Sequence, residues 1–500
     1  MKQILYLLLG CLIPFQFLTA KMYSSPERTP VDYVNPYIGN ISHLLVPTYP
    51  TVHLPNSMLR VYPERENFTG NTINGLPLIV TSHRGSSAFN LSPYQGELQK
   101  AGSIIQYGYD NEVIKPYYYS VDLDDDGMYV QYAPSHQSGI YQIDFSQTDK
   151  PAYLIFNTRN GELKTDGKSI SGYQKLGNHT QVYIYLETDQ QPLKIGTHQG
   201  AVIRTTDKST QGHNAYYILE YPKGTASVLL RYGVSFISSE QAKQNLRREI
   251  KNYNLQAVAD KGRSVWNETL GKIFVKGGTE NEKTVFYTSL YRTYERMICI
   301  SEDGRYFSAY DGQVHDDEGI PFYVDDWIWD TYRATHPLRL IIETEMESNM
   351  VNSLIRMAYQ MQPNWMPTFP EINGDSRRMN CNHGVATVLD AYNKGMRSFD
   401  LAKAYQVCKA AITEKTLAPW SSKPAGVLDQ FYKDHGYFPA LAVGEQETVP
   451  EVHSWERRQP AAVTLGTVYD EWCLGNIAQA LGDKKEADYF LKRSLNYHKI

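Results

Sequence analysis

The chain has 500 residues and a formal net charge of −5, with 42% hydrophobic and 21% charged residues. These proportions are typical of soluble globular proteins, and they exclude a disordered, collagen-like or coiled-coil chain as a whole. No basic excess points to nucleic acid, and five cysteines without a CxxC pair exclude a zinc ribbon and a thioredoxin-type motif. At ~100–200 residues per domain, we expect more than one domain.

The first 20 residues have the pattern of a secretory signal peptide. A lysine precedes an apolar run over residues 4–18, and small and polar residues follow, with Ala20 as the expected cleavage site. The mature protein is therefore expected to be secreted or periplasmic. The alternative is an outer-membrane lipoprotein anchored through Cys11. The run is too short for a comfortable membrane span, and no later stretch is long and apolar enough, so we do not expect an integral membrane protein.

Residues 28–236 are predicted to form an antiparallel β-sandwich. Short segments rich in β-branched and aromatic residues recur there, for example 152–156, 182–187 and 228–232. Turn pairs such as Asn160-Gly161 and Asp166-Gly167 separate them at hairpin spacing. Many short strands with frequent turn signals are typical of a sandwich.

From Ser238 onward the pattern becomes helical. Ser238 can cap a helix that runs through Leu255, and residues 237–280 are assigned as a helical linker. Seven further helices are predicted in residues 281–500, over 282–297, 326–343, 346–361, 383–396, 400–415, 467–481 and 483–498. All seven tryptophans lie at or after residue 266, so an aromatic-rich site is expected in the helical part.

Familiar catalytic and metal-binding motifs are absent. Residues 122–127 resemble the start of an EF-hand loop, but Ala133 occupies the position of the required glutamate, so we expect a turn there. No nucleophile elbow, P-loop, dinucleotide-binding or HExxH motif occurs.

Acidic side chains beside two tryptophans mark the most interesting segment. On a helix, Asp326, Asp330 and Arg333 share one face. One interpretation is structural, with a helix cap, a first-turn acid and an i,i+3 ion pair. The other is a carbohydrate site, where carboxylates bind hydroxyls and aromatic rings pack against C–H faces. Asn382 and His383 open a second helix, where they serve as a cap or face a ligand.

Several segments in a fixed order carry a resemblance to one family. The principal ones are VDYVNPYIG (31–39), FYTSLY (286–291), DGRY (303–306), WDTYRATHPL (329–338), DAYNKG (390–395) and YDEWC (469–473). In order and wording they resemble glycoside hydrolase family 92, the calcium-dependent exo-acting α-mannosidases. The resemblance implies a multidomain β + α chain with an N-terminal antiparallel β-sandwich, a helical linker and a C-terminal (α/α)6 barrel.

The resemblance also implies an activity and a cofactor. The family hydrolyses α-mannosidic linkages of mannose-containing glycans with inversion, and calcium binds sugar hydroxyls. Its general acid and base lie in an EGNxW and a GN(D/E)D segment, and neither occurs in these 500 residues. We therefore expect a chain truncated before its catalytic acid and base, with an incomplete barrel and no activity as it stands. No metal ligand is assigned from the sequence.

Five residues are expected to contact substrate on the strength of the resemblance. Trp329 would pack against an apolar sugar face, Asp330 would accept hydroxyl hydrogen bonds, and Arg333 would orient Asp330. Asn382 and His383 would line the entrance to the same sugar-binding site. The alternative for all five is structural packing within the barrel.

Two departures from the family leave other functions open. Residues 75–83 differ from the family's Gly-Phe-Ser-His-rich stretch, which favours another glycosidase specificity on the same scaffold. Residues 464–466 lack the usual acidic residue. The missing acid and base favour a non-catalytic glycan-binding pseudo-enzyme.

Overall fold

The computed structural model describes residues 28–42, 48–66, 69–81, 87–123, 127–177, 179–199, 202–379 and 381–500. The expected signal peptide (1–20), Cys11 and the end of the 75–83 region lie outside these residues.

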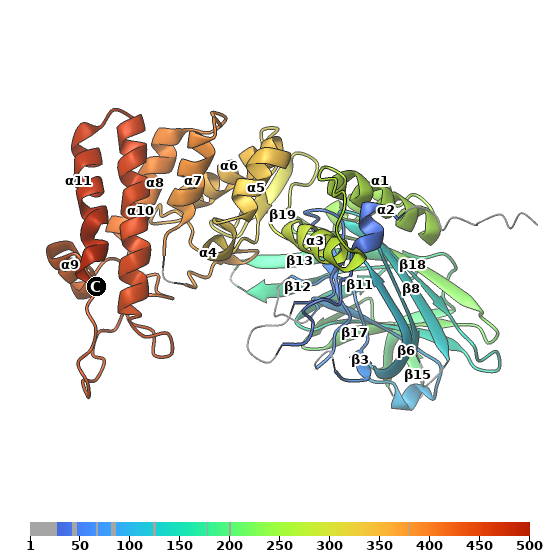
Figure 1. The fold of residues 1–500 in the computed structure, drawn as a ribbon. Coiled ribbons are helices and arrows are strands. Elements are labelled where there is room, and N and C mark those ends of the chain that lie inside the picture. Colours follow the sequence, from blue (N-terminus) through green and yellow to red (C-terminus); the bar gives the residue numbers. More distant parts are fainter. Residues whose placement is uncertain are drawn as a thin grey trace, which may run out of the picture.

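Two antiparallel sheets form the N-terminal domain (Figure 1). The ten-stranded sheet contains, in spatial order, β16 (Ser209–Gly212), β11 (Gly161–Thr165), β12 (Ser169–Gly177), β13 (Thr180–Thr188), β18 (Ser227–Ser235), β9 (Ser138–Asp144), β8 (Met128–Pro134), β7 (Tyr118–Leu123), β6 (Gln106–Lys115) and β3 (Thr72–Asn74). The six-stranded sheet contains β15 (Val202–Arg204), β14 (Lys194–Gln199), β17 (Ala215–Tyr221), β10 (Ala152–Thr158), β5 (Phe89–Tyr94) and β4 (Leu76–Pro77). A separate ribbon pairs β1 (Val52–His53) with β2 (Arg60–Val61).

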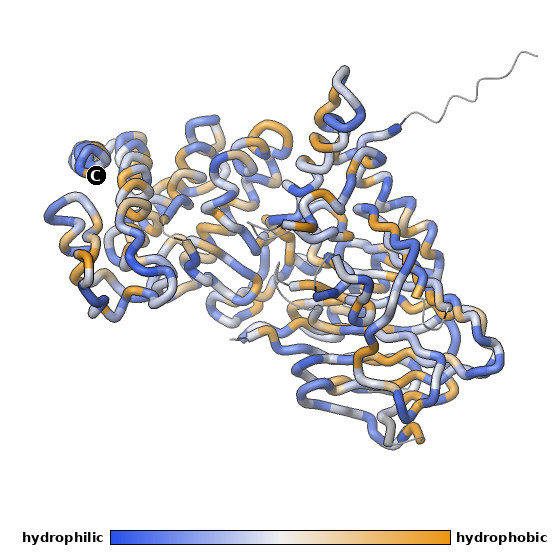
Figure 2. Tube along the Cα trace, turned by 60° about the horizontal axis from the view of Figure 1, so that its bottom comes forward, coloured by the Kyte–Doolittle hydropathy of each residue, from blue (hydrophilic) through white to orange (hydrophobic). Residues whose placement is uncertain are grey.

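Alternating hydrophobicity explains the sheets. In β13, Val182, Ile184 and Leu186 are buried while the residues between them are half-exposed. Figure 2 shows the same change between orange and blue along the strands. Buried tyrosines join this core with their hydroxyls satisfied, since Tyr141 and Tyr232 donate to the carbonyls of residues 77 and 78, both at 2.6 Å.

One of the two expected hairpins forms. Asp166-Gly167 joins β11 to β12, whose register pairs Thr165 with Ile170. Asn160-Gly161 does not close a hairpin, because β10 is already paired on both edges, with β5 and β17. The chain instead crosses there to the other sheet.

The helix predicted from Ser238 is two helices. Gln241 N donates to Ser238 Oγ at 3.1 Å, so the predicted cap of α1 (Ser239–Glu249) is present. Ile250 is extended, however, and Asn254 caps a new helix, α2 (Leu255–Leu270). A single helix through Leu255 was therefore a wrong prediction, since the chain turns between two caps.

The helical part follows and extends away from the sandwich in Figure 1. Its helices are α3 (Glu280–Thr293), α4 (Ile328–Thr331), α5 (Thr335–Ile342), α6 (Thr344–Gln360), α7 (Gly384–Asn393), α8 (Leu401–Thr413), α9 (Val427–His435), α10 (Pro460–Ala480) and α11 (Lys484–Ser494). Short ribbons pair β19 (Ile298–Cys299) with β22 (Tyr323–Val324), β20 (Arg305–Ser308) with β21 (Gln313–Asp316), and β23 (Pro370–Glu371) with β24 (Gly374–Asp375). The predicted order of a β-rich domain before a helical one is confirmed. Among the described residues, no helix is both long and apolar enough to cross a bilayer.

The helix predicted over 326–343 is interrupted. It consists of α4 and α5, which are separated by a turn over residues 332–334. Pro337 explains the break, because it has no N–H for the carbonyl of Arg333 and its ring would clash with that carbonyl in a continuous helix. In the first turn of α5 the missing donor costs little.

Buried polar contacts join the sandwich to the helical part. Arg60 on β2 forms an ion pair with Asp325, and both side chains are almost completely buried. Glu302 accepts hydrogen bonds from Phe236 N at 2.9 Å and from Asn245 Nδ2 at 2.7 Å. Burial raises the pKa of the Glu302 carboxyl to about 7. The segment that leads into α4 is thus held against the sandwich.

Candidate functional site

The turn that carries α4 rests on a buried charged triad. His336 Nε2 lies 2.8 Å from Asp326 Oδ2, and His336 Nδ1 lies 2.6 Å from Glu347 Oε1. All three side chains are at most 1% exposed. Burial alone would lower the pKa of His336, but the carboxylates of Glu347 and Asp326 outweigh it and raise the pKa to about 10. The imidazolium therefore joins the segment just before α4 to α5 and α6.

The three predicted residues of this turn lie at its surface. Trp329 is half-buried, and Asp330 and Arg333 are exposed. Desolvation, and then the nearby carboxylate of Asp326, raise the pKa of Asp330. The expected ion pair between Asp330 and Arg333 is absent from the described contacts. Arg333 Nε instead donates to Tyr332 Oη at 3.0 Å, and its guanidinium lies 5.6 Å from the Trp329 ring centroid.

The other two predicted residues are held by an aspartate from α10. Asn382 N donates to Asp470 Oδ2 at 2.8 Å, and His383 Nδ1 lies 2.7 Å from Asp470 Oδ1. Asn382 and His383 are 4% and 5% exposed, and Asp470 is fully buried. Within the described residues, Asn382 Oδ1 has no hydrogen-bond partner. This buried amide oxygen therefore has an unused hydrogen-bond acceptor position.

Tyr332 brings the two segments together. Its ring centroid lies 4.1 Å from that of His383 and 6.1 Å from that of Tyr469 on α10. Tyr469 in turn stacks with Trp472, and these two side chains are 40% and 43% exposed. The start of α7 therefore lies against the segment that bears Trp329 and Asp330, with an aromatic surface beside it.

Sequence reasoning missed four residues of this neighbourhood: Tyr332, His336, Tyr469 and Asp470. The His-Pro pair at 336–337, directly after the motif, was an available signal for the first turn of a new helix. Asp470 lies in the YDEWC segment, but no local pattern pointed to its partners, which lie 87 and 88 residues earlier in the chain.

The residues present do not by themselves fit calcium. This hard cation takes six to eight oxygen ligands. Asn382 Oδ1 offers one, but the described residues contain no group of three or more His, Cys, Asp or Glu side chains placed to hold a metal ion.

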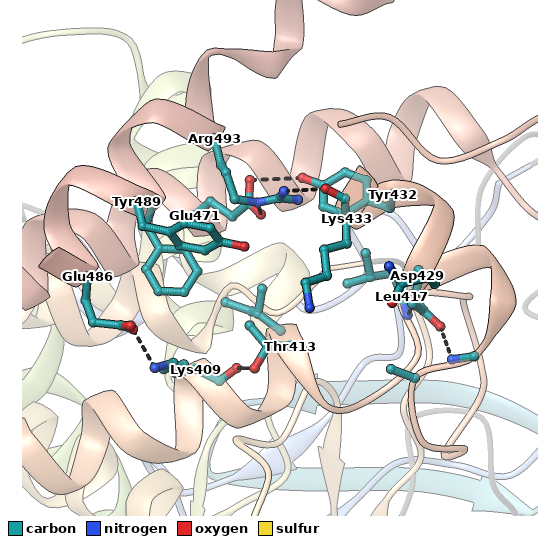
Figure 3. Close-up of a pocket in the computed structure, with 15 residues that line it drawn as sticks. Lys409, Thr413, Leu417, Asp429, Tyr432, Lys433, Glu471, Glu486, Tyr489 and Arg493 are labelled. Atoms are coloured by element: carbon teal, nitrogen blue, oxygen red, sulfur yellow. Dashed lines mark hydrogen bonds and ion pairs between the residues drawn. The ribbon is translucent and has the colours of Figure 1, made fainter. Parts of the chain in front are cut away.

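A cavity of about 310 Å³ lies elsewhere, between α8, α9, α10 and α11 (Figure 3). None of the five predicted residues lines it. Arg493 Nε pairs with Glu471 Oε1 at 2.6 Å, and Lys409 Nζ pairs with Glu486 at 2.5 Å. Because these charges neutralise each other, the cavity carries no marked preference for a charged ligand.

Comparison with known proteins gives matches over nearly the whole chain. The family model described as the glycosyl hydrolase family 92 N-terminal domain matches residues 33–235, and that of the family 92 catalytic domain matches residues 241–500. An "uncharacterized secreted glycosidase" of Arthroderma benhamiae is 22% identical, over 98% of this chain and 64% of that protein.

Solved structures give the same result. An inverting mannosidase of family GH92 from Bacteroides thetaiotaomicron has a TM-score of 0.81 and 25% identity, over 94% of this chain and 65% of that one. A family GH92 α-mannosidase of the same organism, in complex with mannoimidazole, has a TM-score of 0.81 and 21% identity, over 94% and 64%. The chain therefore spans slightly less than two thirds of the length of these relatives.

Proposed function

Because the chain belongs to glycosyl hydrolase family 92, we propose that it is part of a glycosidase that acts on α-mannosidic linkages of mannose-containing glycans. The observation that carries the proposal is the α4 turn. It presents Trp329 and Asp330 outward, while the buried Asp326–His336–Glu347 triad fixes its backbone. An aromatic ring beside a carboxylate suits the C–H face and the hydroxyls of a sugar.

In this proposal the chain's own residues bind and orient the sugar. Asp330 accepts hydrogen bonds from sugar hydroxyls, and Trp329 covers an apolar face of the sugar. Asn382 and His383 line the entrance to this sugar-binding site. Arg333 acts on Asp330 by its charge, since its hydrogen bond goes to Tyr332.

Inverting hydrolysis needs a carboxylic acid and a carboxylate about 6.5–9.5 Å apart, with water between the carboxylate and the sugar. We place both groups outside residues 1–500, in the acidic segments that the family resemblance implies. Residues 1–500 alone are then inactive. The calcium that the family uses would likewise take most of its ligands from elsewhere.

The domain assignment and location are parts of the same proposal. We assign residues 28–236 to the sandwich, 237–280 to the linker, and 281–500 to part of an (α/α)6 barrel. The name of the Arthroderma relative and the pattern of residues 1–20 support a secreted or periplasmic protein.

Mannoimidazole, the ligand of the related α-mannosidase structure, provides a direct test. The chain should bind it in calorimetric titration, and Asp330→Asn should weaken binding by roughly tenfold or more, because charge-assisted hydrogen bonds contribute ~1.5–3 kcal/mol. Asp390→Asn is the matched control, since Asp390 is a partly exposed carboxylate of α7 that pairs with Lys394 at 2.7 Å. Equal affinity for glucoimidazole would favour another glycosidase specificity. Unchanged binding by Asp330→Asn would refute the assigned site.

A further inference from the structure

Aromatic and guanidinium groups form a continuous line that starts beside α4. The Arg296 guanidinium lies 3.7 Å from the ring centroid of Trp327, the residue that precedes α4. Trp327 stacks on Phe369, with centroids 5.3 Å apart and planes at 25°. The Arg378 guanidinium lies 5.9 Å from the Phe369 ring centroid. The line thus leads away from the candidate site, from one π surface to the next.

The line ends at two tryptophans near the surface. Arg378 lies 5.8 Å from the Trp420 ring centroid, and Trp420 lies 5.8 Å from Trp455. Trp455 is 74% exposed, and His453 lies 5.2 Å from Trp420. We call these two rings together the Trp420–Trp455 platform.

The platform is held by an uncommon backbone. Trp420 has a φ of 59°, in the left-handed region that bulky residues rarely adopt. Arg377, whose carbonyl accepts a hydrogen bond from Trp420 N at 3.2 Å, has a φ of 49°. Arg457 and Gln459, just after Trp455, have φ values of 60° and 45°. Such conformations cost of the order of 1–3 kcal/mol each and persist where the surroundings fix them, often at ligand sites.

The chemistry of the surroundings favours a carbohydrate over a protein partner. Large contiguous apolar patches mark protein-binding surfaces, whereas the polar residues Ser454 and Glu456 flank Trp455 in the chain. Arg378 is one third exposed and pairs with Glu371 at 3.2 Å, so it offers hydrogen-bond donors beside the rings. Flat aromatic faces bordered by polar groups match the alternating C–H and hydroxyl surfaces of sugars.

We propose that the Trp420–Trp455 platform binds the part of the glycan that lies away from the bond to be cleaved. Sugars further along the chain would stack there while the terminal sugar occupies the α4 turn. The inference rests on the proposed function, because the two sites are joined only if the ligand is a glycan. It adds a second binding area to the site of Trp329 and Asp330.

Two probes separate the two sites. α-Linked mannopentaose can reach both, whereas mannoimidazole, with a single sugar ring, can fill only the α4 turn. In calorimetric titrations of the chain, Trp455→Ala should weaken mannopentaose binding by roughly 5–10-fold and leave mannoimidazole binding unchanged. Trp455→Phe should retain most of the affinity. Val443→Ala, at a fully exposed residue of the same 441–459 segment, is the matched control.

Each outcome decides between the proposals. Unchanged mannopentaose affinity in Trp455→Ala would overturn the platform and leave the proposed function intact. If the unmodified chain binds neither probe, the proposed function is overturned as well. If Trp455→Ala instead abolishes a concentration-dependent self-association seen by sedimentation, the platform is a protein contact and the glycan proposal fails. Because Trp455 is exposed, its replacement should not disturb folding, and equal unfolding midpoints would verify this.

Discussion

His336 should make the stability of the chain depend on pH in a defined window. Its imidazole lies between Asp326 and Glu347 with 1% exposure. The folded-state pKa, about 10, is above the ordinary value of 6.5. The stability that the charged ring contributes is therefore complete below pH 6.5 and is lost as the pH rises through 10.

The size of this effect follows from the same two pKa values. Moving the pKa from 6.5 to about 10 corresponds to about 5 kcal/mol, at ~1.4 kcal/mol for each pH unit. His336→Gln removes the cation from a buried cluster and leaves two carboxylates facing each other. Breaking such a buried pair costs ~3–5 kcal/mol near neutral pH. The variant should therefore be much less stable than the parent at pH 6.5 and nearly equal to it at pH 10.5.

Urea unfolding from pH 6 to pH 10.5, followed by tryptophan fluorescence, measures the free energy of unfolding of the parent and of His336→Gln at each pH. His213→Gln, at an exposed histidine of the sandwich, serves as the control and should follow the parent at every pH. A constant difference between His336→Gln and the parent over the whole range would refute the reasoning, because a neutral histidine that only fills space gives no such slope.

Three further predictions concern the site, the reaction and the domain junction. In a catalytically competent form of the enzyme, Asp330→Asn should lower kcat/KM by roughly 10–100-fold without lowering the unfolding midpoint; the reverse pattern would make Asp330 a structural residue. Residues 1–500 should not hydrolyse an aryl α-mannoside, with or without calcium, and turnover that persists through repurification would show that the acid and base are misplaced. Burial raises the pKa of Glu302 from 4.5 to about 7, so the folded state favours the neutral carboxyl. The corresponding contribution to the free energy of unfolding, about 3 kcal/mol, is lost as the pH rises from 4.5 through 7. Glu302→Gln should flatten that slope in urea titrations, and an unchanged slope would contradict the assignment.

Local patterns in the sequence predicted the architecture better than they predicted the site. The change from strands to helices after Ser235 and the cap at Ser238 are local features, and both are present in the structure. The break before α5 was also readable, because Pro337 excludes a continuous helix. α9 was missed because it is only nine residues long and follows Gly426, which has no capping side chain.

The site depends on contacts between distant parts of the chain. Asp326 and Arg333 were expected on one helical face, but the α4 turn is too short to align them. Asp326 instead turns inward to His336, and Arg333 turns to Tyr332. The role of Asp470 at the start of α7 could not be predicted from local patterns, because only the folded packing of α7 and α10 brings these residues together.

The buried pair of Arg60 and Asp325 bears on how such proteins can be recombined. Arg60 belongs to the sandwich, whereas Asp325 lies three residues before α4, and neither charge reaches water. A chimera that combines this sandwich with the helical part of a relative would leave one of these charges buried without its partner, unless the relative carries the same pair. The penalty for an uncompensated buried charge, ~3–5 kcal/mol, is a large share of the stability of a typical domain. The two halves should therefore be inherited as a unit, and exchange by recombination should succeed only between chains that match at both positions.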